Sequence, residues 1–108
     1  MKIIYNKILP PKGFAAINIF GILFARKGAN ITEKTKNHER IHTAQMRELL
    51  YIPFYVLYLL EWLIKLLFYG GSAYRNLSFE REAYNNDDNL QYLETRKPYA
   101  WVKSIFKA

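Results

Sequence analysis

A long apolar segment, residues 49–69, places the strongest constraint on how this chain folds. It is about as long as the roughly 20 residues that cross a bilayer as a helix, and Gly70-Gly71 ends it. Three residues within it, Pro53, Glu61 and Lys65, disfavour a single membrane span. With 108 residues, the chain can build one modest core and therefore one domain.

The helix formed by residues 49–69 would be very apolar for so small a domain. Its polar stripe, through Tyr58, Glu61 and Lys65, spans less than about a quarter of the helical wheel, whereas a surface helix typically buries a stripe of about 100°. One small sheet and two other helices are too little to cover the rest. We therefore expect a second copy of the chain or a membrane surface to cover this segment. A buried core helix is the alternative.

The tail of the chain, residues 95–108, is basic and aromatic. Its three lysines lie near Trp101 and Phe106, a combination that suits an anionic lipid surface; they are Lys97, Lys103 and Lys107. The N-terminus does not resemble a cleaved signal peptide, because no small-x-small site follows its apolar stretch. We predict a cytoplasmic location and leave peripheral attachment to a membrane open.

The first 31 residues are typical of β-strands. Residues 2–9 are rich in β-branched and aromatic side chains, and Pro10-Pro11 ends this run because neither proline has an N–H for a sheet. Residues 14–25 are apolar on both alternating faces, as in a buried strand that bends or breaks at Gly21. We expect a small antiparallel β-hairpin or meander here.

The middle of the chain is predicted to be helical. Thr32 is a suitable N-cap for a helix that begins near residue 33. Pro53 should kink or end this helix near Ile52, and a second helix then includes the apolar segment. Ser78 can cap a third helix over residues 79–94.

These elements predict an α+β fold in a single domain, residues 1–108, with the hairpin packed on about three helices. The domain consists of a β region (1–31), a helical region (32–94) and the tail (95–108). The absence of cysteine excludes thiolate metal sites, and the two histidines in one helix exclude a Ser-His-Asp triad. The net charge of +7 is scattered along the chain without a nucleic-acid motif, so we expect no nucleic-acid partner.

Residues 38–42 read His-Glu-Arg-Ile-His, the H-E-x-x-H pattern, inside the first predicted helix. Residues four apart lie on one face of a helix, so His38 and His42 can bind the same metal ion. Glu39 lies about 100° around the helix, beside the metal. From there its carboxylate can accept a proton from a zinc-bound water without binding the ion.

A catalytic zinc needs a third protein ligand and an open position for water. The chain has no further histidine, so the third ligand must be a carboxylate. The candidates are Glu80 and Glu82, at the start of the third predicted helix. Ala83 provides a small side chain where that helix can pack closely against the helix of His38 and His42.

H-E-x-x-H followed by E-x-x-A near the start of a later helix resembles the gluzincin group of zinc metallopeptidases, most closely the small single-domain minigluzincins. The resemblance implies a zincin-like fold with Glu80 as third ligand and Ala83 as the small residue. Tyr84 occupies the position of an aspartate that supports a ligand histidine in that group, and Asp87, one turn further, can replace it. The resemblance also implies an edge strand along which a peptide substrate lies, and residues 14–25 fit that position.

Two functions follow as hypotheses. In the first, the chain is a zinc-dependent metallopeptidase that hydrolyses peptide bonds in a peptide or protein, with Glu39 activating zinc-bound water. In the second, it is a non-catalytic membrane-peripheral or oligomerising module whose H-E-x-x-H pattern is structural or vestigial. Whether the chain is an enzyme stays open at this point.

Overall fold

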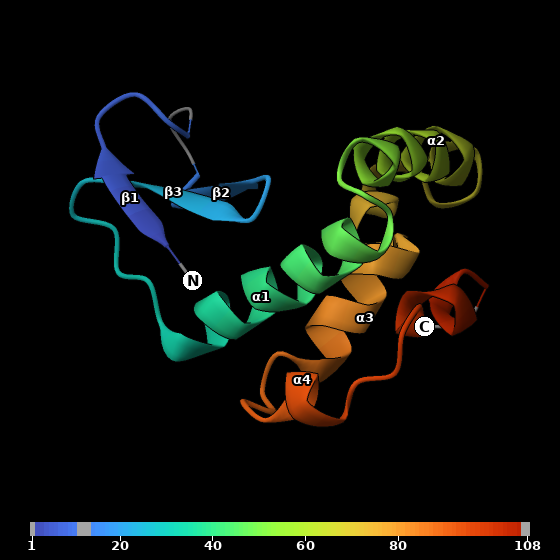
Figure 1. Ribbon diagram of the computed structural model, residues 1–108. Coiled ribbons are helices and arrows are strands. Elements are labelled where there is room, and N and C mark those ends of the chain that lie inside the picture. The colour runs from blue at the N-terminus through green and yellow to red at the C-terminus, as the bar shows by residue number, and fades with distance from the viewer. Residues whose placement is uncertain (1, 11–13, 107–108) are drawn as a thin grey trace.

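The chain folds into a small three-stranded sheet followed by four α-helices and short 3-10 turns, as the computed structural model shows for residues 2–10 and 14–106 (Figure 1). The strands are β1 (Ile3–Asn6), β2 (Ala16–Ile19) and β3 (Ile22–Arg26), and the helices are α1 (Glu33–Glu48), α2 (Ile52–Tyr69), α3 (Ser78–Asn86) and α4 (Tyr92–Thr95). Three 3-10 turns complete the fold: η1 (Gly70–Ser72), η2 (Tyr74–Asn76) and η3 (Ala100–Ser104). The predicted α+β class is confirmed.

The sheet is mixed, with strand order β1-β3-β2. The predicted hairpin is present between β2 and β3, and its two-residue turn has positive φ at Phe20 (51°) and Gly21 (88°), which favours glycine. The prediction of an antiparallel meander is wrong for β1, which pairs with β3 in parallel. Strand β3 is therefore central, with Leu23 and Ala25 fully buried, and β2 is an edge strand.

The start of α1 and both ends of α2 lie close to where the sequence predicts them, but α1 ends at Glu48, before the expected end near Ile52. The Thr32 hydroxyl accepts a hydrogen bond from the Thr35 N–H at 3.1 Å and caps α1. Helix α1 ends at Glu48, and Pro53 lies in the first turn of α2, where a missing N–H costs nothing. Leu50 and Tyr51 adopt positive φ between the two helices.

The third predicted helix, residues 79–94, is wrong in its length and its cap. Helix α3 ends at Asn86, and a separate short helix, α4, follows. The break falls in the run Asn-Asn-Asp-Asp-Asn, whose side chains compete for backbone hydrogen bonds. Ser78 is the first residue of α3 and Leu77 is its cap residue; Glu61 accepts hydrogen bonds from the Ser78 N–H (3.0 Å) and hydroxyl (2.7 Å).

Helix α3 lies in the centre of the helical part, and its residues 78–83 are all buried. Helix α1 crosses one side of it, and the tail packs on another (Figure 1). An aromatic cluster joins the elements: the ring of Phe79 lies 4.8 Å from that of Phe54 and 4.6 Å from that of Trp101. The tail as far as Phe106 is therefore part of the folded body and packs on the outer side of α3.

Helix α2 is long and largely exposed. Of its residues, Phe54 and Lys65 alone are buried. The stretch Ile52–Ser72 has the length and hydropathy of a membrane-crossing helix, and 11% of its most apolar window is buried. The predicted wide apolar surface is thus present.

Candidate metal centre

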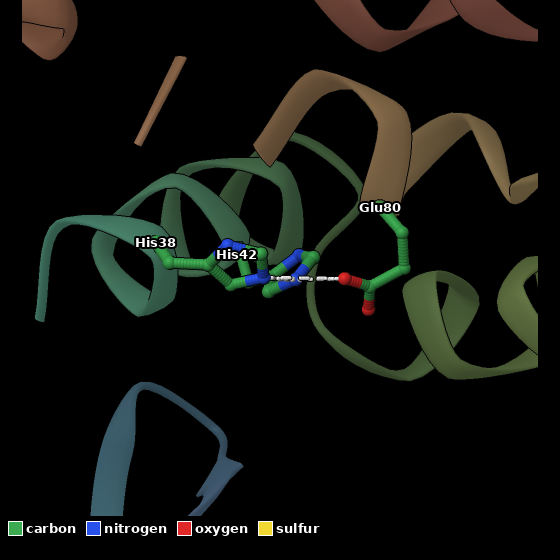
Figure 2. Close-up of side chains that lie close together, drawn as sticks. All are labelled: His38, His42 and Glu80. Carbon is green, nitrogen blue, oxygen red and sulfur yellow. Dashed lines mark hydrogen bonds and ion pairs between the residues drawn. The ribbon is translucent and has the colours of Figure 1, made fainter. Parts of the chain in front are cut away.

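Three side chains from two helices meet where α1 crosses α3. His38 and His42 lie one turn apart on α1, and Glu80 reaches toward them from the first turn of α3 (Figure 2). Glu80 Oε1 lies 3.2 Å from His38 Nε2 and 3.1 Å from His42 Nε2, and the two nitrogens are 3.2 Å apart. His42 and Glu80 are buried, and His38 exposes 12% of its side chain.

These separations match a tetrahedral zinc site. With zinc–ligand distances of about 2.0–2.1 Å, ligand atoms in a tetrahedron are about 3.3 Å apart. The three atoms of His38, His42 and Glu80 form a triangle of that size. The group could therefore hold a metal ion.

The outer nitrogens of both histidines face hydrogen-bond acceptors. His38 Nδ1 lies 3.0 Å from Asp87 Oδ2, and His42 Nδ1 lies 2.8 Å from Gln45 Oε1. The orientation of the Gln45 amide is fixed, because its Nε2 donates to the Phe79 carbonyl (3.0 Å) and to Glu82 (2.9 Å). Each neutral imidazole therefore carries its hydrogen on Nδ1.

This tautomer leaves both Nε2 lone pairs directed at each other and at the Glu80 carboxylate. Three acceptor atoms within 3.2 Å repel one another unless a cation lies between them. The cation can be a metal ion or a proton on an imidazole. The donor set, two imidazoles and one carboxylate, is the one found in many catalytic zinc sites.

The charges at the centre show which group takes up a proton when metal is absent. Burial opposes a charge on His42, but the attraction of the Glu80 carboxylate, and the hydrogen bond that His42 donates to it, raise the pKa of His42 to about 9. Burial likewise opposes a charge on Glu80, but the two histidines and the Tyr58 hydroxyl hold the pKa of Glu80 well below its usual range. Tyr58 donates to Glu80 Oε2 at 2.6 Å and leaves Oε1 directed at the imidazoles.

The two supporting residues expected from the sequence both contact His38. Asp87 accepts the hydrogen bond at Nδ1, so a carboxylate one turn beyond the expected position orients the ring. The ring of Tyr84 packs edge-on against His38, with centroids 4.6 Å apart. The guanidinium of Arg75 lies 3.6 Å from the centroid of the Tyr84 ring.

The alternative ligand, Glu82, lies outside the triangle. It is buried in an ionic cluster, where Arg96 donates to Oε1 (3.0 Å) and Tyr92 to Oε2 (2.7 Å). Arg96 also binds Glu48 at the end of α1. Glu82 therefore joins α1, α3 and the segment after α4, and Glu80 is the carboxylate next to the imidazoles.

A cleft of about 430 Å³ opens beside the triangle, between α1 and the edge strand β2. His42, Glu80 and Glu39 line one side of it, and residues 16–18 of β2 line another. Asn18 connects the two sides, since its amide donates to the Glu39 carbonyl at 3.1 Å. Glu39 is half-buried, lines the cleft and takes no part in the triangle.

Sequence reasoning missed Gln45 and three cleft residues, Asn18, Tyr58 and Tyr74. Gln45 follows His42 by three residues on the same helix, so the spacing alone could have indicated a contact. Asn18, Tyr58 and Tyr74 belong to other elements and to no motif. The folded chain alone shows that they line the same cleft as Glu39 and Glu80.

Comparisons of the chain with protein-family models, with curated proteins and with solved structures found no match.

Proposed function

We propose that the chain is a zinc-dependent metallopeptidase in which His38, His42 and Glu80 bind the metal and Glu39 is the general base. The observation that carries the proposal is the convergence of three ligand atoms, two of them from residues that line a cleft. A structural zinc site is usually closed by four protein ligands. In the part of the chain that the structure describes, this group has three.

The chain's own residues account for most of the chemistry. Zinc, when bound, supplies a Lewis acid that polarises a carbonyl and lowers the pKa of water. Glu39 lines the cleft next to His42 and is not a ligand. It accepts a proton from water as the water attacks the substrate carbonyl, and it can pass this proton to the leaving amine. Burial raises the pKa of Tyr74, which keeps this cleft-lining hydroxyl protonated as a hydrogen-bond donor.

The edge strand supports an extended peptide as the substrate. Strand β2 pairs with β3 on one side, and its other edge lies along the cleft. A peptide can add to such an edge through main-chain hydrogen bonds, which bind it without regard to sequence. The apolar side chains at the cleft, Phe14, Ile17 and Met46, favour a peptide with apolar residues.

Metal content and a two-variant comparison test the proposal. The protein purified without chelator should contain about one zinc per chain. Glu39→Gln should abolish hydrolysis of quenched-fluorescence peptides and keep the zinc, because a base is lost and no ligand is removed. His42→Ala should lose both. The matched control is Glu33→Gln, an exposed glutamate on the same helix, which should retain both.

Equal loss of zinc in Glu39→Gln and His42→Ala would place Glu39 among the ligands and refute the assignment. Zinc-loaded protein without hydrolysis of any peptide would instead favour a non-catalytic module. The exposed surface of α2 is the observation behind that second function, because it gives the chain a binding surface that needs no chemistry.

A further inference from the structure

Helix α2 turns its charges inward and its apolar side chains outward. Its two charged residues, Glu61 and Lys65, form an ion pair at 3.0 Å on the side that faces the folded body. Glu61 also accepts from Ser78, and Lys65 donates to the Asn76 carbonyl. The outward side of α2, all of which the structure describes, therefore presents no charged side chain.

The outward side is wide. At about 100° per residue, the exposed apolar positions from Leu66 through Ile52 to Phe68 cover an arc of about 200°, hereafter the apolar arc. Eight of its members expose half or more of their surface: Ile52 (59%), Val56 (52%), Leu59 (55%), Leu60 (50%), Leu63 (52%), Ile64 (57%), Leu67 (84%) and Phe68 (77%). A contiguous apolar surface of this kind marks a binding site.

The width of the apolar arc favours lipid over a second copy of the chain. A helix that packs on α2 would cover a stripe of about 100° and leave the other half of the arc in water. The hydrocarbon of a bilayer covers all of it. The net charge of +7 draws such a chain to anionic lipid.

The inward side of α2 determines how the helix lies in the lipid. It contacts the body along its whole length, from Phe54, whose ring packs on Phe79, to Tyr69, whose hydroxyl accepts from Arg81 at 3.2 Å. If α2 crossed the bilayer, these polar partners in α3 would be carried into hydrocarbon. The helix must therefore lie flat, with the body on the water side.

We propose that α2 lies in the plane of an anionic membrane surface, with its apolar arc in the hydrocarbon, and anchors the chain to one leaflet. The tail extends this surface. A groove of about 870 Å³ runs between α2 and the tail, lined by Ile64, Phe68 and Trp101, and Phe106 at its rim is 91% exposed. This inference rests on the shape and polarity of α2 and holds whether or not the chain is a peptidase.

Vesicle flotation with exposure-matched variants tests the proposal. The full chain should float with vesicles of phosphatidylglycerol and phosphatidylcholine. The double variant Leu63→Lys/Leu67→Lys should lose partitioning by roughly tenfold or more, because charges are costly in hydrocarbon. The control Ile8→Lys/Leu90→Lys adds the same charge at positions of nearly equal exposure (82% and 50%) outside α2, and should float like the parent chain.

A depth measurement separates the flat arrangement from a membrane span. The chain has no cysteine, so single variants Val56→Cys, Leu63→Cys and Leu67→Cys each accept one fluorophore. These positions share one face, and Val56 and Leu67 are about 16 Å apart along the helix. Quenching by lipids brominated at known depths should place all three labels at the same depth.

Labels whose depths differ by about 16 Å would show a crossing helix and overturn the proposal. So would a chain that stays off anionic vesicles and sediments as a dimer, since a second copy would then cover the apolar arc. Equal flotation of both lysine variants would also refute it, because the apolar arc would then have no role in binding.

Discussion

Zinc binding should release a proton from His42, and the pKa of His42 determines how many protons are released per chain. In the metal-free centre, Glu80 raises the pKa of His42 to about 9. At pH 7.5 such a group is about 97% protonated, whereas an imidazole of ordinary pKa is about 10% protonated. Zinc needs the neutral imidazole, so binding must displace close to one proton per chain from His42.

Calorimetry measures this release directly. Titration of zinc into the metal-free protein at pH 7.5, in buffers of different ionisation enthalpy, gives the number of protons released. The apparent affinity should also rise roughly 20-fold between pH 7 and 8.5, as the imidazole loses its proton. Glu33→Gln, which alters an exposed charge on the same helix, should leave both results unchanged.

A release near 0.1 proton at pH 7.5, with an affinity independent of pH above 7, would refute the reasoning. It would mean that Glu80 does not charge His42, and that the three atoms meet only when the metal draws them together.

Further predictions follow from the same contacts. Metal-free protein should lose about 3 kcal/mol of stability as the pH rises from 6.5 through 9, because the raised pKa of His42 stabilises the fold below that range; urea unfolding should show no such loss with zinc bound. Glu82→Gln should destabilise the protein by about 3–5 kcal/mol, by breaking the buried pair with Arg96, and keep zinc binding; Glu80→Gln should lose zinc binding and also lower the stability of the metal-free protein, because His42 loses its buried partner. Gln45→Leu removes the partner of His42 and should weaken zinc binding about 10–100-fold in a competition titration.

Local patterns predict the ligand helices well. His38 and His42 come together whenever residues 38–42 are helical, so their convergence needs no other element. Thr32 marks a helix start through its hydroxyl, and Pro53 marks one through its missing N–H. The sequence leaves Glu80 and Glu82 open as the third ligand, and the E-x-x-A spacing with Ala83 favours Glu80. These inferences depend on residues within one or two turns of each other.

Features that depend on distant partners could not be predicted. The parallel pairing of β1 with β3 is decided by which strand lies in the centre of the sheet, and a strand's own sequence does not encode its neighbour. Ser78 has the residue type of an N-cap, but it is the first helical residue of α3 and does not cap the helix. Its own N–H is instead bonded by Glu61, which belongs to a different helix. Tyr58 reaches Glu80 across the same interface without any motif.

The inward side of α2 makes the position of the helix and the metal centre thermodynamically dependent on each other. Tyr58 binds the free oxygen of Glu80, and Glu61 holds the N-terminus of α3, so both contacts weaken if α2 moves away from α3. Any ligand that binds better when α2 is packed against α3 must then raise the affinity of the centre for metal. Metal binding must in turn raise the affinity for that ligand by the same factor. This factor has an upper limit. If α2 is packed against α3 in one-tenth of the metal-free molecules, the ligand can raise the metal affinity at most about tenfold.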